Sequence, residues 1–170
     1  MKKILALFIV LAIIGITLVA TVGMVSACEP PPPPGQIDCR FTYTDPPYAE
    51  LSSIVLNARG KPTPGGLFFW LTATNMSGPK TMIAIIPDGF KFQSQSPVEV
   101  TVNGVDAGPV EFVPVSVGTA VIWEGTVPPD STIEMKIHLK FKCGEAAGLY
   151  DFYGATNGLL CQKTLPVLGP

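Results

Sequence analysis

The sequence predicts an all-β domain, an antiparallel β-sandwich that follows an N-terminal apolar helix and a proline-rich linker. Three observations lead to this prediction. Beyond residue 28, apolar and polar residues alternate in short segments, as in half-buried strands. The chain contains 18 prolines and 17 glycines, and these residues place turns between the segments. No stretch past residue 28 shows the 3.6-residue apolar period of a helix.

The N-terminal segment, residues 1–27, has the order of a signal peptide or membrane anchor. Lys2 and Lys3 precede an uncharged apolar run, Ile4 to Val25, and the small residue Ala27 completes a signal-peptidase pattern. Cleavage would release the protein, whereas the run is also long enough to remain as a membrane anchor. A third fate is lipidation of Cys28, because Val-Ser-Ala-Cys resembles a bacterial lipobox. All three fates place the rest of the chain outside the cytoplasm, since the lysines stay inside.

Residues 28–36 are expected to link this segment to the folded domain. The five consecutive prolines from Pro30 to Pro34 favour polyproline II, which extends by roughly 3.1 Å per residue. We expect this run to hold the domain about 15 Å from the membrane surface. The domain itself is expected at residues 37–165, with a short tail at 166–170.

Two strands show the alternation most clearly, at residues 37–43 and 133–143, where every second residue is apolar. Further strands are expected at residues 51–58, 67–74, 81–86, 98–102, 110–115, 120–126 and 149–156. Turn residues separate them at Pro87-Asp88-Gly89, Asn103-Gly104 and Pro128-Pro129-Asp130. About eight or nine short strands without intervening helices predict an antiparallel sandwich of the immunoglobulin-like kind.

Three segments resemble the conserved immunoglobulin-like repeat domain of prokaryotic cell-surface proteins. They are Phe69–Pro79, Ile86–Phe92 and Gly125–Ile133, and the resemblance covers about residues 67–157. Pro129-Asp130 departs from it, because the family tends to have Pro-Gly there. The resemblance implies an extracellular module used for structure or adhesion, and it implies no catalysis.

Four cysteines in an exported chain suggest disulfides, and four allow three pairings. If Cys28 is lipidated, Cys39 and Cys143 can pair, because both lie on apolar strand faces, and Cys161 is left over. If Cys28 is free, Cys28 with Cys39 and Cys143 with Cys161 is the competing scheme. We expect at least one disulfide, and we expect it to involve Cys143.

The sequence gives no reason to expect an enzyme. Nucleophilic catalysis needs a base, and the sole histidine, His138, lies between Lys136 and Lys140 on its strand face. The chain contains no Cys-x-x-Cys, and His138 and Cys143 lie on different faces, so no metal site is expected. No cofactor is expected either. The net charge of −2 argues against nucleic acid as a partner.

Three surface features are candidates for binding or modification. Lys136, His138, Lys140 and Lys142 form a basic stripe that could contact an anionic envelope polymer or lipid headgroups, although solvated lysines at a sheet edge also explain it. Two aromatic residues, Phe68 and Trp70, share a strand face with threonines and could stack on a sugar ring, although burial on both faces also explains them. Asn75 begins a glycosylation sequon at an expected turn.

These features indicate a non-enzymatic surface module for adhesion, envelope structure or protein assembly. We expect it at the cell surface, held at the membrane by its N-terminal segment, with surface proteins or envelope polymers as partners and with self-association as an option. One alternative is a subunit of a pilus-like filament, because archaeal pilins also have an apolar helix before a β-sandwich; the proline run argues against it. The second alternative is a carbohydrate-binding module that uses Phe68 and Trp70.

Overall fold

The computed structural model of the protein describes residues 34–44, 48–93 and 95–170. The described residues belong to one unit, from Pro34 to Pro170. The expected signal peptide or anchor at residues 1–27, Cys28 and most of the proline run lie outside the described residues. Within the described part of the chain, no helix is long and apolar enough to cross a membrane.

The secondary structure of the described residues is β throughout, which confirms the all-β prediction. The eleven strands are β1 (Gln36–Tyr43), β2 (Ile54–Leu56), β3 (Pro62–Thr63), β4 (Leu67–Pro87), β5 (Phe90–Phe92), β6 (Val98–Val102), β7 (Val105–Asp106), β8 (Glu111–Val115), β9 (Gly118–Phe141), β10 (Gly148–Thr156) and β11 (Leu159–Leu168).

All eleven strands belong to one sheet. Its order is β3-β2-β11-β10-β4-β9-β6-β7, while β1 pairs with β4 and both β5 and β8 pair with β9. The pairing is antiparallel except where Ile54 and Val55 of β2 run parallel to the end of β11. The sheet is therefore mixed, and the expectation of a wholly antiparallel sheet is wrong at this pair.

The two longest strands, β4 with 21 residues and β9 with 24, each replace two strands expected from the sequence. They pair with each other along their lengths, with register shifts between Ala73 and Gly78 of β4. Asn75, Gly78 and Asp130 have positive φ values of 57°, 73° and 57°. The expected turns at Asn75 and at Pro128–Asp130 are thus corrected to β-bulges, which bend a strand without reversing it.

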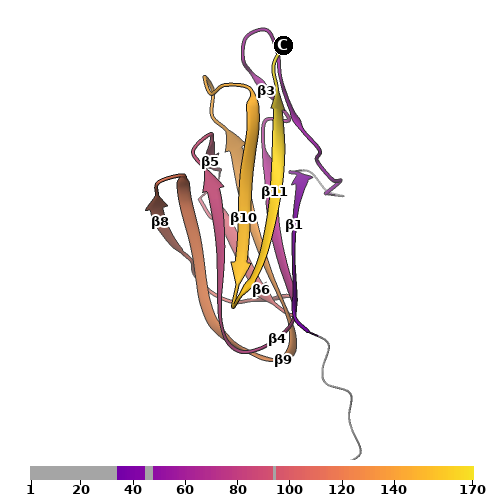
Figure 1. Ribbon diagram of the computed structural model, residues 1–170, viewed down its shortest axis with the longest axis vertical. Helices are drawn as coiled ribbons and strands as arrows, with labels where there is room; N and C mark the ends of the chain where they lie inside the picture. The colour runs from indigo at the N-terminus through magenta and orange to yellow at the C-terminus, as the bar shows by residue number, and fades with distance from the viewer. Residues whose placement is uncertain (1–33, 45–47, 94) are drawn as a thin grey trace, which may run out of the picture. The chain divides into compact units, whose positions relative to one another are not determined.

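The bulges turn the single sheet into two facing layers. Before the shift, odd-numbered residues of β4 such as Leu71 are buried; after it, even-numbered residues such as Ala84 are buried. One extra residue in a bulge exchanges the two faces of a strand. Figure 1 shows both long strands folding over at one end of the domain, so that their halves face each other.

One layer contains β1, the first half of β4, the second half of β9, and β6. The other contains the second half of β4, the first half of β9, β8, β10 and β11. Buried aromatic rings fill the space between the layers. Phe152 of β10 lies 4.8 Å from Phe41, 5.0 Å from Phe69 and 4.9 Å from Phe90, measured between ring centroids.

A disulfide joins the first strand to the last, because Cys39 of β1 bonds to Cys161 of β11. Cys143 is free and exposed, so the expectation that the bridge involves Cys143 is wrong. Its strand ends at Phe141, and Cys143 therefore lies beyond the alternation that would have turned it inward. The bridge also needs Gly154, since a Cβ there would come within 2.8 Å of the Cys161 sulfur.

The strand that carries Cys161 was not among the strands expected from the sequence. β11 extends from Leu159 to Leu168 and pairs with β10 from Leu159 to Val167. The last strand thus continues into residues 166–170, which were expected to be a tail.

Candidate functional site

Three aromatic side chains form a ridge on the outer side of the first layer. Phe68 and Trp70 point outward from β4, and Tyr48 comes from the loop that follows β1. The ring of Tyr48 stands at a steep angle to both others, 5.7 Å from Phe68 and 5.8 Å from Trp70. Tyr48 is the most accessible of the three, with 40% of its surface exposed. We call Tyr48, Phe68 and Trp70 the aromatic ridge.

Cations and one hydrogen bond hold the ridge in place. The indole Nε1 of Trp70 donates to Thr42 Oγ1 at 2.8 Å. The guanidinium of Arg40 lies 5.3 Å from the ring centre of Trp70. The ammonium of Lys136 lies 5.5 Å from the ring centre of Trp70 and 5.6 Å from the ring centre of Phe68. Such cation–π contacts contribute about 0.5–1 kcal/mol each at exposed sites. These contacts hold the rings of Phe68 and Trp70 in place.

Two hollows flank the ridge. The smaller, of about 210 Å³, is lined by Phe68, Ser96, Pro97, Glu99, Lys136 and His138. The larger, of about 290 Å³, is lined by Asp38, Cys39, Arg40, Thr42, Tyr48, Glu50 and Lys163. Lys136 forms an ion pair with Glu99 in the first hollow, and Lys163 lies 3.8 Å from Glu50 in the second.

The side chain of His138 lies in the smaller hollow, with its ring 4.7 Å from Phe68. Partial burial, and secondarily the charge of Lys136, lower the pKa of His138 below its ordinary value of 6.5. The ring is therefore neutral at pH 7. Its Nε2 atom is buried and has no hydrogen-bond partner among the described residues, which is uncommon for a buried polar atom.

The structure divides the basic stripe that the sequence suggested. Lys136 and His138 belong to the site, since β9 places them opposite Trp70 and Phe68. Lys140 instead lies opposite Lys91 of β5, and Lys142 donates a hydrogen bond to the carbonyl of Asp88. Asn75, the glycosylation candidate, lies half-buried in the β4 bulge.

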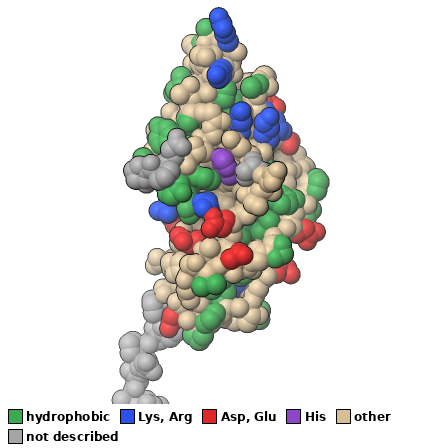
Figure 2. Space-filling model, turned by 180° about the vertical axis from the view of Figure 1, so that it is seen from behind, with side chains coloured by type: hydrophobic (Ala, Val, Ile, Leu, Met, Phe, Trp, Pro, Cys, Tyr) green, Lys and Arg blue, Asp and Glu red, His purple; other side chains and the backbone are tan. Residues whose placement is uncertain are grey.

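Figure 2 shows the face of the domain that carries this site. The purple side chain is the only histidine of the chain, with green hydrophobic side chains beside it and blue and red ones below. Charges of both signs thus lie close to the ridge.

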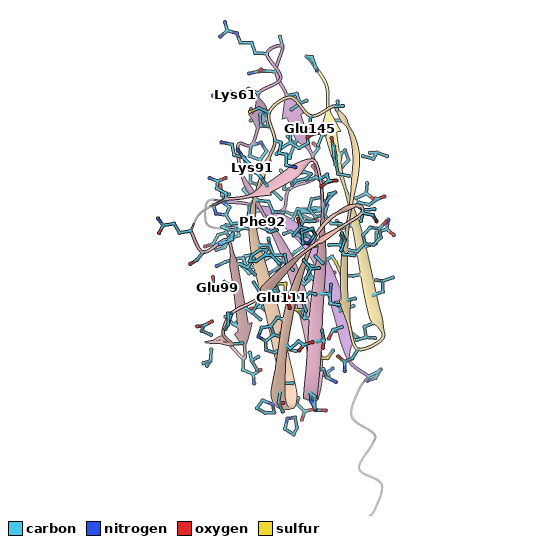
Figure 3. All side chains as sticks on the ribbon, turned by 90° about the vertical axis from the view of Figure 1, so that its left-hand side faces the viewer. Lys61, Lys91, Phe92, Glu99, Glu111 and Glu145 are labelled. Atoms are coloured by element: carbon cyan, nitrogen blue, oxygen red, sulfur yellow. A yellow bond between two sulfur atoms is a disulfide. The ribbon has the colours of Figure 1, made fainter. Side chains whose placement is uncertain are left out.

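Among the described residues, the carboxylates Glu99 and Glu111 are not placed as a catalytic pair. Glu99 lies opposite Lys136 on one layer, while Glu111 lies opposite Ile122 on the other. Figure 3 shows these two carboxylates on separate strands. The described residues also contain no group of His, Cys, Asp and Glu side chains that could hold a metal ion.

Sequence reasoning missed several residues of the site. Arg40 and Thr42 alternate with the core residues of β1, so their outward direction was predictable from the period of two. Tyr48 and Glu50 follow β1 in a loop, and Lys163 lies on the unexpected strand β11. Their proximity to Trp70 depends on which strands become neighbours, which no local pattern reveals.

The outer side of the second layer has a different composition. Ile83 and Ile85 of β4 point outward there, Ile83 lies opposite both Ile122 and Ala155, and Ile85 lies opposite Tyr153. All of these residues are half-buried. We call Ile83, Ile85, Ile122, Tyr153 and Ala155 the aliphatic face; the strands that carry it are at the front of Figure 1.

No family model matches the sequence, and no curated protein matches it. Among solved structures, the fold is similar to BcpA, the major pilin subunit of Bacillus cereus, with a TM-score of 0.50 and 13% identity over 80% of this chain and 40% of that chain. The pilus backbone protein RrgB of Streptococcus pneumoniae gives a TM-score of 0.49 and 12% identity, over 73% of this chain and 31% of RrgB. A collagen-binding domain of a Staphylococcus aureus adhesin gives 0.43 and 8%, over 67% and 94%.

The similarity to BcpA identifies the fold as one that occurs in a surface pilin. This chain spans less than half the length of that pilin. The sequence identity of 13% is too low to transfer the roles of individual residues from BcpA to this chain.

Proposed function

We propose that this chain is a non-enzymatic module of the cell surface, used for adhesion, envelope structure or assembly with other surface proteins. The observation that carries the proposal is the fold, which resembles that of a pilin subunit. The Cys39–Cys161 disulfide supports an extracellular location, because disulfides persist in oxidising compartments. The resemblance of residues 67–157 to a repeat domain of surface proteins leads to the same function.

Attachment to the membrane is part of the proposal. The N-terminal segment would hold the domain either as an uncleaved helix or through a lipidated Cys28, and cleavage would release it. Intact-mass analysis of the mature protein separates the three, because retained Met1, lipidated Cys28 and free Cys28 differ by large and distinct masses.

The location can be tested through Cys143, the free and exposed thiol. A maleimide that does not cross membranes should label Cys143 in intact cells to the same extent as in lysed cells. The Cys143→Ala variant controls for labelling elsewhere, including Cys28. Labelling of Cys143 that requires cell lysis would contradict the surface location.

A second candidate function is that of a subunit in a pilus-like filament. The aliphatic face favours it, since adjoining apolar side chains that stay partly exposed on a sheet mark sites of protein contact. In this alternative a second copy of the chain covers Ile83 and Ile122. Immunogold electron microscopy of the native cell surface discriminates between the two: fibres labelled along their length support the filament, and scattered labelling supports a separate module.

A further inference from the structure

We propose that the aromatic ridge and its two hollows bind a neutral carbohydrate chain. In this proposal the rings of two or more sugars lie against Tyr48, Phe68 and Trp70, and their hydroxyl groups bond to charged side chains in the hollows. The proposal goes beyond a structural role at the surface, which would require no such site.

The balance of charge identifies the class of ligand. Arg40, Lys136 and Lys163 are the cations that line the hollows, and the anions are Asp38, Glu50 and Glu99. His138 is neutral at pH 7 because its pKa is lowered. Equal numbers of each sign repel an ionic ligand as much as they attract it. They suit hydroxyl groups, which accept from cations and donate to carboxylates.

The ridge supplies the apolar part of recognition. One face of a sugar ring carries C–H groups, and aromatic side chains bury such surface at low cost in conformational entropy. Arg40, Lys136 and the hydrogen bond from Trp70 to Thr42 fix the rings of Trp70 and Phe68 in advance. The conformational entropy lost by these side chains on binding is therefore small.

The Nε2 atom of His138 provides an independent observation. It is buried in the smaller hollow and lacks a hydrogen-bond partner among the described residues. A neutral imidazole can donate to, or accept from, a hydroxyl group. Because Nε2 is buried in the unliganded structure, the imidazole would have to turn toward the hollow before a sugar hydroxyl could bond to it. The Lys136–Glu99 ion pair is accessible to the same hydroxyl without such a change.

The dimensions favour an extended chain over a compact ligand. The hollows, of about 210 and 290 Å³, lie on opposite sides of the ridge, and each is below the roughly 300–1,000 Å³ of a pocket for a drug-sized molecule. Each hollow therefore suits about one sugar ring. A linear oligosaccharide that crosses the ridge would use both.

The experiment uses the full chain in a detergent without a sugar headgroup, because a maltoside or glucoside would compete for the site. Cellohexaose, xylohexaose, mannohexaose and chitohexaose serve as neutral probes, and polygalacturonate serves as the anionic probe. Only two tryptophans are present, so a ¹H–¹⁵N spectrum contains two indole resonances. A binding sugar should shift the Trp70 resonance and leave that of the buried Trp123 unchanged.

Matched tyrosines control the test. Tyr48 and Tyr43 are 40% and 42% exposed, but only Tyr48 belongs to the ridge. Tyr48→Ala should weaken binding about tenfold or more, which corresponds to roughly 1.4 kcal/mol, whereas Tyr43→Ala should bind normally. His138→Ala should weaken binding as well, since it removes one of the polar side chains that line the smaller hollow.

Three outcomes overturn the proposal. The first is that none of the neutral oligosaccharides shifts the Trp70 resonance at millimolar concentration. The second is that a neutral oligosaccharide binds to Tyr48→Ala as well as to the wild type. The third is that only polygalacturonate binds, with an affinity that falls steeply as salt increases, which would identify an electrostatic surface. Failure of sugar binding leaves the surface location untouched, because labelling of Cys143 tests that separately.

Discussion

The aromatic ridge and the aliphatic face both include residues of β4, yet their surroundings differ in chemistry. The first half of β4 directs Phe68 and Trp70 outward, whereas its second half directs Ile83 and Ile85 outward. The outward side chains of the first half are held by cations and a hydrogen bond. Those of the second half meet other apolar side chains across the neighbouring strands.

This difference shows what a bulge does for function. Because the register shifts near Asn75, one continuous strand contributes to both layers and presents two separate outer surfaces. A polar, preorganised surface is suited to a soluble ligand. A mainly apolar surface is suited to another protein surface, although Glu111 lies opposite Ile122 on it. The two faces can therefore serve two functions in one small domain.

The largest expected effect comes from opening the edge where the two layers are joined. Cys39→Ala with Cys161→Ala removes a bridge of sequence separation 122. Loop-closure entropy predicts a loss of roughly 4–5 kcal/mol in the free energy of unfolding for a loop of this length. Urea denaturation of the oxidised chain and of the variant measures the difference.

Cys143→Ala is the matched control for this variant, since it removes an exposed thiol that has no bridge. It should change the free energy of unfolding by no more than about 0.5 kcal/mol. A larger loss from Cys143→Ala than from the double variant would contradict the observed pairing.

The next largest effect comes from the core that both faces share. Phe152 is fully buried and contacts Phe41, Phe69 and Phe90. Phe152→Ala should cost about 3–5 kcal/mol, because it leaves a cavity between the layers. Phe112→Ala is the comparison: this ring is 42% exposed and pairs with Phe92 at the surface, so about 1 kcal/mol is expected. Equal losses in denaturation would show that the layers do not share one core.

The sequence predicted the phase of most strands correctly. In β9, Ile133, Met135, Ile137, Leu139 and Phe141 are buried, in agreement with the alternation. The positions of the bends were also visible, at Asn75 and at Pro128–Asp130. Whether each bend is a reversing turn or a bulge could not be predicted, because residues that tolerate positive φ occur in both. Only long-range pairing decides between the two.

The candidate site was predictable in part. Phe68, Trp70, Lys136 and His138 could each be identified as outward residues of their strands. That they form one site depends on the register that sets Trp70 opposite Lys136 and Phe68 opposite His138. The disulfide was predicted wrongly for the same reason, since long-range pairing decides which strand lies near β1.

A smaller effect is expected from a change confined to the aliphatic face. Ile83→Thr with Ile122→Thr places hydroxyl groups at two positions that lie opposite each other and keeps β-branched side chains there. Stability should fall by about 1 kcal/mol per position. If a second copy covers this face, sedimentation velocity should show weaker self-association of the variant.

Val105→Thr is the control for the aliphatic face, because Val105 is 70% exposed on β7 and belongs to neither face. It should associate as the wild type does. Unchanged association of the double variant would assign contacts between copies to another surface.

The smallest expected effect is a pH dependence that arises from His138, which lies beside the aromatic ridge. His138 is the sole histidine of the chain, so no other side chain with an ordinary pKa titrates between pH 7.5 and 5.5. Burial and the charge of Lys136 lower the pKa of His138 in the folded state, while that of the unfolded chain stays near 6.5. Below pH 6.5 the unfolded chain therefore binds a proton more readily than the folded one. Stability should fall as the pH decreases from 6.5 toward the folded pKa and stay flat above 6.5.

The fall should be modest, because His138 is only partly buried and Glu99 of the adjacent strand opposes the charge of Lys136. Thermal unfolding at pH 7.5 and 5.5 measures it, with His138→Gln as the variant that should remove the slope. A slope that persists in His138→Gln would assign the pH dependence to groups other than His138. A wild type that becomes more stable at pH 5.5 would mean that the folded state favours protonated His138. The neutral ring proposed for sugar binding would then be wrong.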